Sequence, residues 1–289
     1  MKSFKQYLVP ESVEEAVKLR ARSGSGSLYI AGGTTVVPAA SRAIEVLIDV
    51  NRLGLDCVQI DDASICIGAA AKLAALVTPE IEQSLPMLYK AAHSCATPLI
   101  RNMATMGGAL SGIFLPSDIG IPLLALGANV VLQGNKRRTE ALEDLLPGSW
   151  PPGDDLIIEV EIPLPGDRTG CGFEKFTRNS VDIGLVNVAA MLRISEAGAI
   201  QALRLAVGQS TSPPALLKES DLLEGAGPSG AGELLSEGLV RRIAATASGK
   251  VKAKSDSKAS SEYRKHLIEV LAARVIAAAV NDIGVGIGD

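Results

Sequence analysis

The sequence predicts an α+β fold in which mixed helix–strand segments precede an antiparallel sheet with its own helices. Near the start, Ser12 and Glu15 form the capping box of a helix, and short buried strands follow it. From residue 171 onward, alternating apolar positions predict consecutive strands. Two helical stretches, 231–247 and 259–282, come after these strands. A run of strands and then helices is typical of a sheet that carries helices on one face.

The remaining elements follow from hydrophobic periodicity and from turn residues. The segment 101–114 is rich in glycine and small residues, lacks a helical period and is expected to be irregular. Ser117 is expected to cap the helix that carries Leu123 and Leu124. Further helices are predicted at 12–22, 72–76 and 78–92, and strands at 28–30, 46–50, 58–60, 64–67, 130–132, 156–162, 173–177, 185–194 and 203–207.

Composition excludes two classes of partner. The formal net charge of −4 over 289 residues gives no basic face, so no nucleic-acid partner is expected. The most hydrophobic stretch, 267–280, is shorter than a bilayer requires and contains Glu269 and Arg274, so no membrane span is expected. No apolar run follows Met1, which argues against a signal peptide. The cytoplasm is therefore the expected location.

The residues that usually build a metal site or a catalytic triad are scarce. Four cysteines lie far apart without a C-x-x-C spacing, and the chain has only two histidines, His93 and His266. No metal site and no Ser-His-Asp arrangement is therefore expected. Because side chains alone are poorly suited to catalysis here, the sequence favours a bound cofactor and no catalytic residues of its own.

Two glycine segments are the candidates for binding that cofactor. The first glycine segment, 31–35, reads Ala-Gly-Gly-Thr-Thr, and the second, 105–109, reads Thr-Met-Gly-Gly-Ala. Glycine lets the backbone approach a ligand closely, and successive N–H groups in such a turn can form a concave nest for a pyrophosphate. Neither segment is a Rossmann or Walker motif. The alternative is that each glycine pair only makes a tight turn.

The order of the motifs makes a resemblance specific. The first helix is followed by AGGTTVVP at 31–38, RNMATMGGAL at 101–110 and SDIGIPLLALGA at 117–128. The later segments are FEKFTRNSVDIGLVNVAAML at 173–192 and SSEYRKHLIEVLAARVIAAA at 260–279. Together these segments resemble the FAD-binding (medium) subunit of molybdenum hydroxylases, the flavoprotein family of xanthine dehydrogenase and carbon monoxide dehydrogenase. The resemblance extends over nearly the whole chain.

The resemblance implies a vanillyl-alcohol-oxidase (PCMH)-type FAD-binding domain of two α/β subdomains, followed by an α+β C-terminal domain. The corresponding segments would be 1–55, 56–170 and 171–289. In the family, the two glycine loops hold the FAD pyrophosphate between them. Carried over by position, the first wall would consist of Ile30, Ala31, Gly32, Gly33, Thr34, Thr35 and Val36. The second wall would consist of Ala104, Thr105, Gly107, Gly108 and Ala109.

The resemblance adds five further cofactor residues. Ser117 and Asp118 match a pair that hydrogen-bonds FAD hydroxyls, and a helix cap is the alternative role for them. Leu156 and Ile157 would pack near the flavin or the adenine. Lys175 matches a lysine near the pyrimidine edge of the flavin, where a cation stabilises negative charge on the reduced ring. The alternative is that Lys175 is a solvated residue on the outer face of a strand.

Three positions depart from the family pattern. Ala109 stands where many relatives have asparagine, so one hydrogen bond of roughly 0.5–1.5 kcal/mol would be missing. Ile183 stands where some members place an aromatic ring over the flavin. Thr34 replaces a histidine that is common in the carbon monoxide dehydrogenase branch. Because neither histidine lies in a glycine segment, we expect the FAD to be non-covalent.

The implied function is electron transfer inside a complex. A large molybdopterin-binding subunit would oxidise the substrate, and a small 2Fe-2S subunit would pass the electrons to FAD on this chain. NAD or another acceptor would then receive them. Two alternatives stay open: a stand-alone FAD-dependent reductase or oxidase, and a non-enzymatic assembly subunit that has lost FAD. Activity of the isolated chain would favour the first, and failure to bind FAD the second.

Overall fold

The computed structural model describes residues 4–39, 44–111, 118–145, 154–179, 181–211, 213–223 and 235–284. By its internal contacts the chain divides into two units. The first unit comprises 1–78, 97–113 and 127–163, and the second comprises 79–96, 114–126 and 164–289. The segments 79–96 and 114–126 thus group with the C-terminal part of the chain. The division into 1–55, 56–170 and 171–289 stays a prediction.

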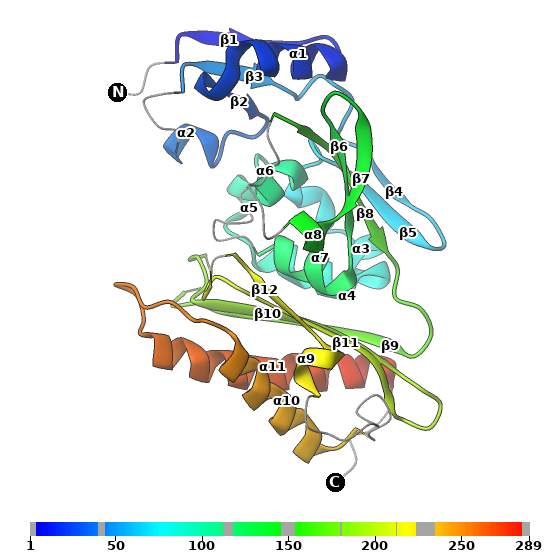
Figure 1. Cartoon of the computed structure of the whole chain (residues 1–289). Coiled ribbons are helices and arrows are strands. Elements are labelled where there is room, and N and C mark those ends of the chain that lie inside the picture. The colour runs from blue at the N-terminus through cyan, green and yellow to red at the C-terminus, as the bar shows by residue number, and fades with distance from the viewer. Residues whose placement is uncertain are drawn as a thin grey trace. The chain divides into compact units, whose positions relative to one another are not determined.

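The first unit begins with a parallel three-stranded sheet in the order β1-β3-β2 (Figure 1). As predicted, Ser12 caps the first helix, because its Oγ accepts the N–H of Glu15 at 3.1 Å. The helix ends at Gly24, whose φ is +55°. The elements are β1 (Gln6–Leu8), α1 (Val13–Ser23), η1 (Gly24–Gly26), β2 (Ser27–Ile30), α2 (Val36–Ala39) and β3 (Val46–Asp49).

A five-stranded antiparallel sheet completes the first unit, in the order β4-β5-β8-β6-β7. The two sheets share one core, in which Ala16 and Ile48 pack with Val131 and Ile158. This burial of apolar surface from both sheets holds the unit together. The elements are β4 (Val58–Ile60), β5 (Ser64–Gly68), η2 (Leu73–Leu76), α5 (Pro98–Arg101), α6 (Met106–Ser111), β6 (Asn129–Gln133), β7 (Arg137–Ala141), α8 (Leu142–Leu145) and β8 (Leu156–Pro163).

The second unit is built on the antiparallel sheet β12-β11-β10-β9. The long helices α10 and α11 lie along it (Figure 1), and residues such as Val188 and Val275 form their shared core. The shorter helices α4 and α7 contact the same strands. The elements are α3 (Pro79–Ser84), α4 (Pro86–Ser94), α7 (Gly120–Leu126), β9 (Thr169–Phe176), β10 (Val186–Ile194), β11 (Ile200–Gly208), β12 (Ala215–Lys218), α9 (Glu219–Leu222), α10 (Glu237–Lys250) and α11 (Ser261–Ile283).

Three local predictions were wrong or incomplete. The helix expected over 78–92 is two helices, because Pro86 has no N–H to continue the first and instead starts the second. In the described part of the segment 101–114, the helix α6 covers Met106–Ser111, so the expectation of an irregular segment is wrong for these residues. The strands β1, β7 and β12 were not predicted, because each is short and much of its surface is accessible to solvent.

Within the described ranges, no helix is long and apolar enough to cross a membrane. Over the same residues, no group of three or more histidine, cysteine or acidic side chains is placed to hold a metal ion.

A buried arginine ties α11 to the rest of the second unit. Only 1% of the Arg264 side chain is exposed, and its Nη2 donates to both carboxylate oxygens of Asp256 at 2.8 Å. Hydrogen bonds from the Lys258 N–H and from Arg264 lower the pKa of Asp256 to about 2. The Asp256 carboxylate therefore stabilises the folded chain at pH values above its pKa in the unfolded chain, about 3.9. This stabilisation is lost as the pH falls towards about 2.

Asp256→Asn should destabilise the second unit, because it leaves the Arg264 guanidinium buried without its counter-charge. We expect a loss of roughly 2 kcal/mol, less than for a fully buried pair since water reaches Asp256. Urea unfolding at a series of pH values from 7 to 2.5 measures the free energy of unfolding. Between pH 4 and pH 2.5 this free energy should fall less for the variant than for the parent. Equal stability of variant and parent at pH 7 would show that the ion pair does not support α11.

Candidate functional site

The first glycine segment connects β2 to α2 and presents backbone donors. Gly33 has a φ of +68°, a conformation that favours glycine, and its carbonyl accepts the Val37 N–H that begins α2. Among the described residues, no acceptor lies within hydrogen-bond distance of the N–H groups at 32–35. Successive N–H groups of this kind form a concave site for an anion. The first glycine segment therefore presents unbonded amides of the kind that can bind a phosphate group.

The second glycine segment uses its amides differently. Four of its five backbone N–H groups donate within the chain: Met106 to Ala71 O at 2.9 Å, Gly107 to Ala69 O at 2.8 Å, Gly108 to Thr105 Oγ1 at 3.2 Å and Ala109 to Thr105 O at 2.8 Å. These four amides are used within the chain, and a role of the second segment as an amide nest stays a prediction. The bonds start α6 and join it to residues 69–71, which lie between β5 and η2. Gly108 is exposed, so the segment offers a surface without a side chain.

Inside the first unit, the first glycine segment lies against Met103 and Ala104, the residues that lead into the second glycine segment. A Cβ on Gly32 would lie 1.9 Å from the carbonyl oxygen of Met103, so any other residue would force this backbone apart. The side chain of Asn51 reinforces the arrangement by donating to Ala31 O at 3.1 Å. On the other side, Lys72 forms a β-bridge with Thr105. Sequence reasoning missed Asn51 and Lys72, because neither lies in a recognisable motif.

The apolar site residues expected on β8 are core residues. Leu156 and Ile157 are 4% and 5% exposed, and Leu156 packs with Ala16 and Ile48 in the core of the first unit. Ile30, at the start of the first glycine segment, is also buried. These residues support the sheets from which the glycine segments extend.

Asp118 and Lys175 form a buried ion pair in the second unit. Lys175 Nζ lies 2.8 Å from Asp118 Oδ2 and 2.7 Å from Ser94 O, and the two side chains are 6% and 7% exposed. Asp118 Oδ1 also accepts Asn187 Nδ2 at 3.1 Å and Gln209 Nε2 at 2.7 Å. The alternative of a solvated lysine on the outer face is therefore wrong. The expected neighbour of Asp118, Ser117, lies outside the described residues.

Burial raises the pKa of Asp118, and the Lys175 ammonium opposes that rise together with the amides of Asn187 and Gln209. The positive charge of Lys175 is thus matched by a carboxylate inside the protein. Asn187 and Gln209 were missed by sequence reasoning. Both lie at strand ends, and Gln209 adopts a φ of +61°, which no pattern of residue types indicates.

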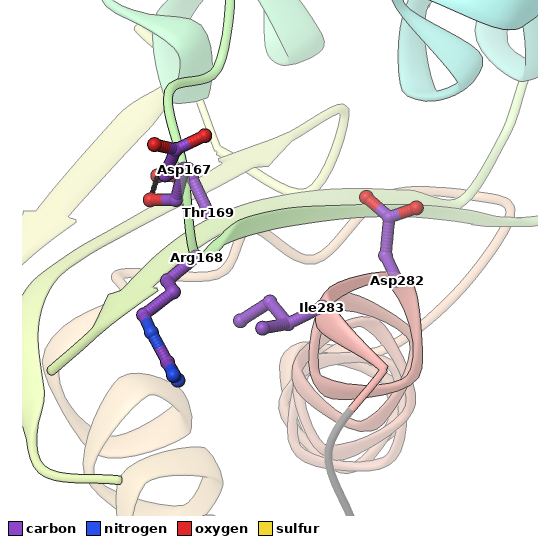
Figure 2. A pocket seen from close by; sticks show the side chains of 5 residues that line it. All are labelled: Asp167, Arg168, Thr169, Asp282 and Ile283. Carbon is purple, nitrogen blue, oxygen red and sulfur yellow. Dashed lines mark hydrogen bonds between the residues drawn. The ribbon is translucent and has the colours of Figure 1, made fainter. Parts of the chain in front are cut away.

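A polar hollow of about 550 Å³ in the second unit is lined by residues from two places in the chain: Asp167, Arg168, Thr169, Asp282 and Ile283. Figure 2 shows the Arg168 side chain extending away from the carboxylates of Asp167 and Asp282. Asp282 accepts the Cys171 N–H at 3.0 Å and so holds β9 to α11. Because its charged groups diverge, the hollow lacks the converging polar groups of a ligand site.

Comparison with known protein families shows that both glycine segments lie within a known type of domain. The family model for the FAD binding domain in molybdopterin dehydrogenase matches residues 2–165. The chain belongs to this family. A second family model, the CO dehydrogenase flavoprotein C-terminal domain, matches residues 172–279. The chain is thus a flavoprotein subunit of the oxidoreductase class, with FAD as its cofactor.

Individual relatives agree with the family. The 6-hydroxypseudooxynicotine dehydrogenase complex subunit alpha of Paenarthrobacter nicotinovorans is 35% identical over 71% of this chain and 73% of the relative. The nicotine 6-hydroxylase medium subunit of the same organism is 31% identical over 94% of this chain and 95% of the relative. A carbon monoxide dehydrogenase structure from Hydrogenophaga pseudoflava superimposes with a TM-score of 0.87 at 25% identity, covering 98% of this chain and 99% of the other. The predicted fold class is therefore confirmed.

Lys175→Met should destabilise the flavoprotein by about 3–5 kcal/mol at pH 7, because it leaves the Asp118 carboxylate buried without a counter-charge. The pKa of Asp118 then rises further above its unfolded value, so the variant should regain part of the loss as pH falls from 7 to 5. Urea unfolding of the second unit at both pH values measures this.

The matched control is Lys90→Met, which breaks the more exposed pair between Lys90 of α4 and Glu174 of β9 and should cost less than ~1 kcal/mol. If Lys175→Met cost no more than Lys90→Met, the buried pair would be energetically unimportant.

Proposed function

We propose that this chain holds one FAD non-covalently, with the N–H groups of Gly32, Gly33, Thr34 and Thr35 donating to its pyrophosphate. The observation that supports this is the set of four successive amides without a protein acceptor. When bound, FAD supplies two-electron redox chemistry. The chain itself contributes position, hydrogen bonds and local charge.

The second glycine segment is proposed to act as a close-fitting wall for the cofactor. Its amides hold α6, so Gly108 and its small neighbours Ala104, Thr105, Gly107 and Ala109 contribute space and not donors. Thr105 is buried and its Oγ1 accepts the Gly108 N–H, so its hydroxyl supports the start of α6. Ile30 and Val36 are proposed to border the same cofactor site from the first segment.

The remaining proposed cofactor residues are Ser117, Asp118, Lys175, Leu156 and Ile157. Because Lys175 is paired with Asp118, these two would act on the flavin as a neutral, rigid hydrogen-bonding pair and not as a lone cation. Leu156 and Ile157 are proposed to act through the core that supports the glycine segments.

Electrons are proposed to enter from a small 2Fe-2S subunit, which receives them from a large molybdopterin-binding subunit, and to leave to NAD or another acceptor. Names of relatives such as "medium chain" and "complex subunit alpha" support assembly with other subunits.

We also propose a cytoplasmic location, since none of the four cysteines, all described, forms a disulfide. The stand-alone reductase is not favoured, because the C-terminal part matches the flavoprotein model.

Gly33→Val should abolish retention of FAD, because a β-branched side chain cannot adopt the backbone that aims these amides at the pyrophosphate. The measurement is the visible flavin absorption of the purified chain relative to protein concentration. Gly54→Val is the matched control, since Gly54 has almost the same φ, +69°, and open space around it. Gly108→Val should also reduce the flavin content, because its side chain would occupy the space proposed for the cofactor.

The proposed site would be refuted by full flavin content in both the Gly33 and the Gly108 variants. A parent protein that stayed colourless with added FAD would instead favour an assembly subunit without cofactor.

Native purification tests the proposed relay independently. The tagged chain, expressed from its own genome, should return with a large subunit that contains molybdenum and a small subunit that contains iron and sulfide. Metal analysis and the masses of the copurified subunits measure this. Recovery of the chain alone, at native expression level and low salt, would contradict the relay.

A further inference from the structure

Lys72 has a fixed backbone position beside the second glycine segment. It follows the buried run 69–71 after β5, and it pairs with Thr105 in an isolated antiparallel bridge. The next residue, Leu73, donates its N–H to Ala104 O at 2.9 Å. The backbone of Lys72 is therefore held at the point where the second glycine segment begins.

Its side chain reaches towards the first glycine segment. Lys72 Nζ lies 3.4 Å from Asn51 Oδ1 and 3.5 Å from Met103 O. Met103 O is the atom that a Cβ on Gly32 would approach to 1.9 Å. The ammonium group thus lies next to the contact between the two glycine segments.

The orientation of Asn51 is determined by its other contacts. Its Nδ2 donates to Ala31 O at 3.1 Å and to Asp49 Oδ1 at 2.6 Å. Since a carboxylate cannot donate, the amide nitrogen faces Asp49 and the amide oxygen faces Lys72. Asp49 is itself bonded by the Tyr7 hydroxyl at 2.8 Å. Asn51 therefore separates the Asp49 charge from the Lys72 charge and links Lys72 to the first glycine segment.

The charge of Lys72 has no carboxylate partner within salt-bridge distance in the described part of the chain. Both of its acceptors are neutral, and both distances exceed the usual N–H···O separation of about 2.9 Å. Lys175 differs, with short contacts of 2.7 and 2.8 Å, one of them to a carboxylate. An accessible ammonium near amides that have no acceptor among the described residues is suited to an anion that both can bind.

We propose that Lys72 binds a phosphate oxygen of the FAD pyrophosphate and completes the anion site that the amides at 32–35 form. The inference rests on the proposed function, and it adds to that site a charged residue that neither the family resemblance nor the sequence motifs assign. Lysine binds phosphate as a point charge, so the charge is the property that matters, more than the exact donor geometry.

Titration of the flavin-free chain with FAD, followed by quenching of flavin fluorescence, tests this inference. Lys72→Met keeps the length and removes the charge, and it should raise the Kd for FAD by about 10- to 100-fold. Lys72→Gln, which keeps a donor, should show a similar loss, and Lys72→Arg should stay within about threefold of the parent. The affinity of the parent should fall with added salt more steeply than that of Lys72→Met.

Lys18→Met is the matched control, because it makes the same change in net charge at an exposed position of α1 in the same unit. It should bind FAD like the parent. If the Lys72→Met and Lys72→Gln variants also bound FAD like the parent, Lys72 would have no role in binding, although the proposed FAD site would stand. If parent and Lys18→Met both failed to bind FAD, the proposed function would fail together with the inference.

Discussion

The site depends on the close approach of Gly32 to the carbonyl oxygen of Met103. This contact is possible only without a Cβ, and it brings the two glycine segments of the first unit together. The bonds from Asn51 to Ala31 and from Leu73 to Ala104 hold the segments on either side of it. With the segments fixed in this way, the amides at 32–35 have no acceptor in the part of the chain that the structure describes, while those at 106–109 are all bonded.

Two lysines illustrate how the protein distributes charge. Lys175 is buried, and its charge is matched by Asp118 with help from Asn187 and Gln209, so it contributes rigidity to the second unit. Lys72 has only neutral acceptors at long distances and lies beside the glycine segments. Since an unmatched charge next to unbonded amides favours an anion, the local electrostatics agree with a flavin dinucleotide as the cofactor of this family.

Much of the fold was predictable from sequence, because hydrophobic periodicity and caps specify local structure directly. The helix opened by Ser12, the strands β9, β10 and β11 of the C-terminal sheet and the two long helices were found in this way. Short strands such as β7 were missed, because their exposed side chains carry little apolar pattern. The helix α6 lies where 101–114 was expected to be irregular, because its start is held by bonds to the distant residues Ala69 and Ala71.

The candidate site was predictable only in part. Adjacent glycines indicated both segments, yet no pattern shows which amides are already bonded, since Ala69 and Ala71 come from a separate strand end. For the same reason the partner of Lys175 and the position of Lys72 could not be deduced. Such pairings depend on tertiary contacts between residues that are, for Lys175 and Asp118, 57 positions apart.

Residue-resolved amide hydrogen exchange, with and without FAD, tests the central claim most directly. Without FAD, the amides at 32–35 should exchange rapidly and those at 106–109 slowly, and FAD should protect the first set strongly while changing the second little. Slow exchange at 32–35 in the absence of FAD, or protection by FAD that appears only at 106–109, would contradict the account.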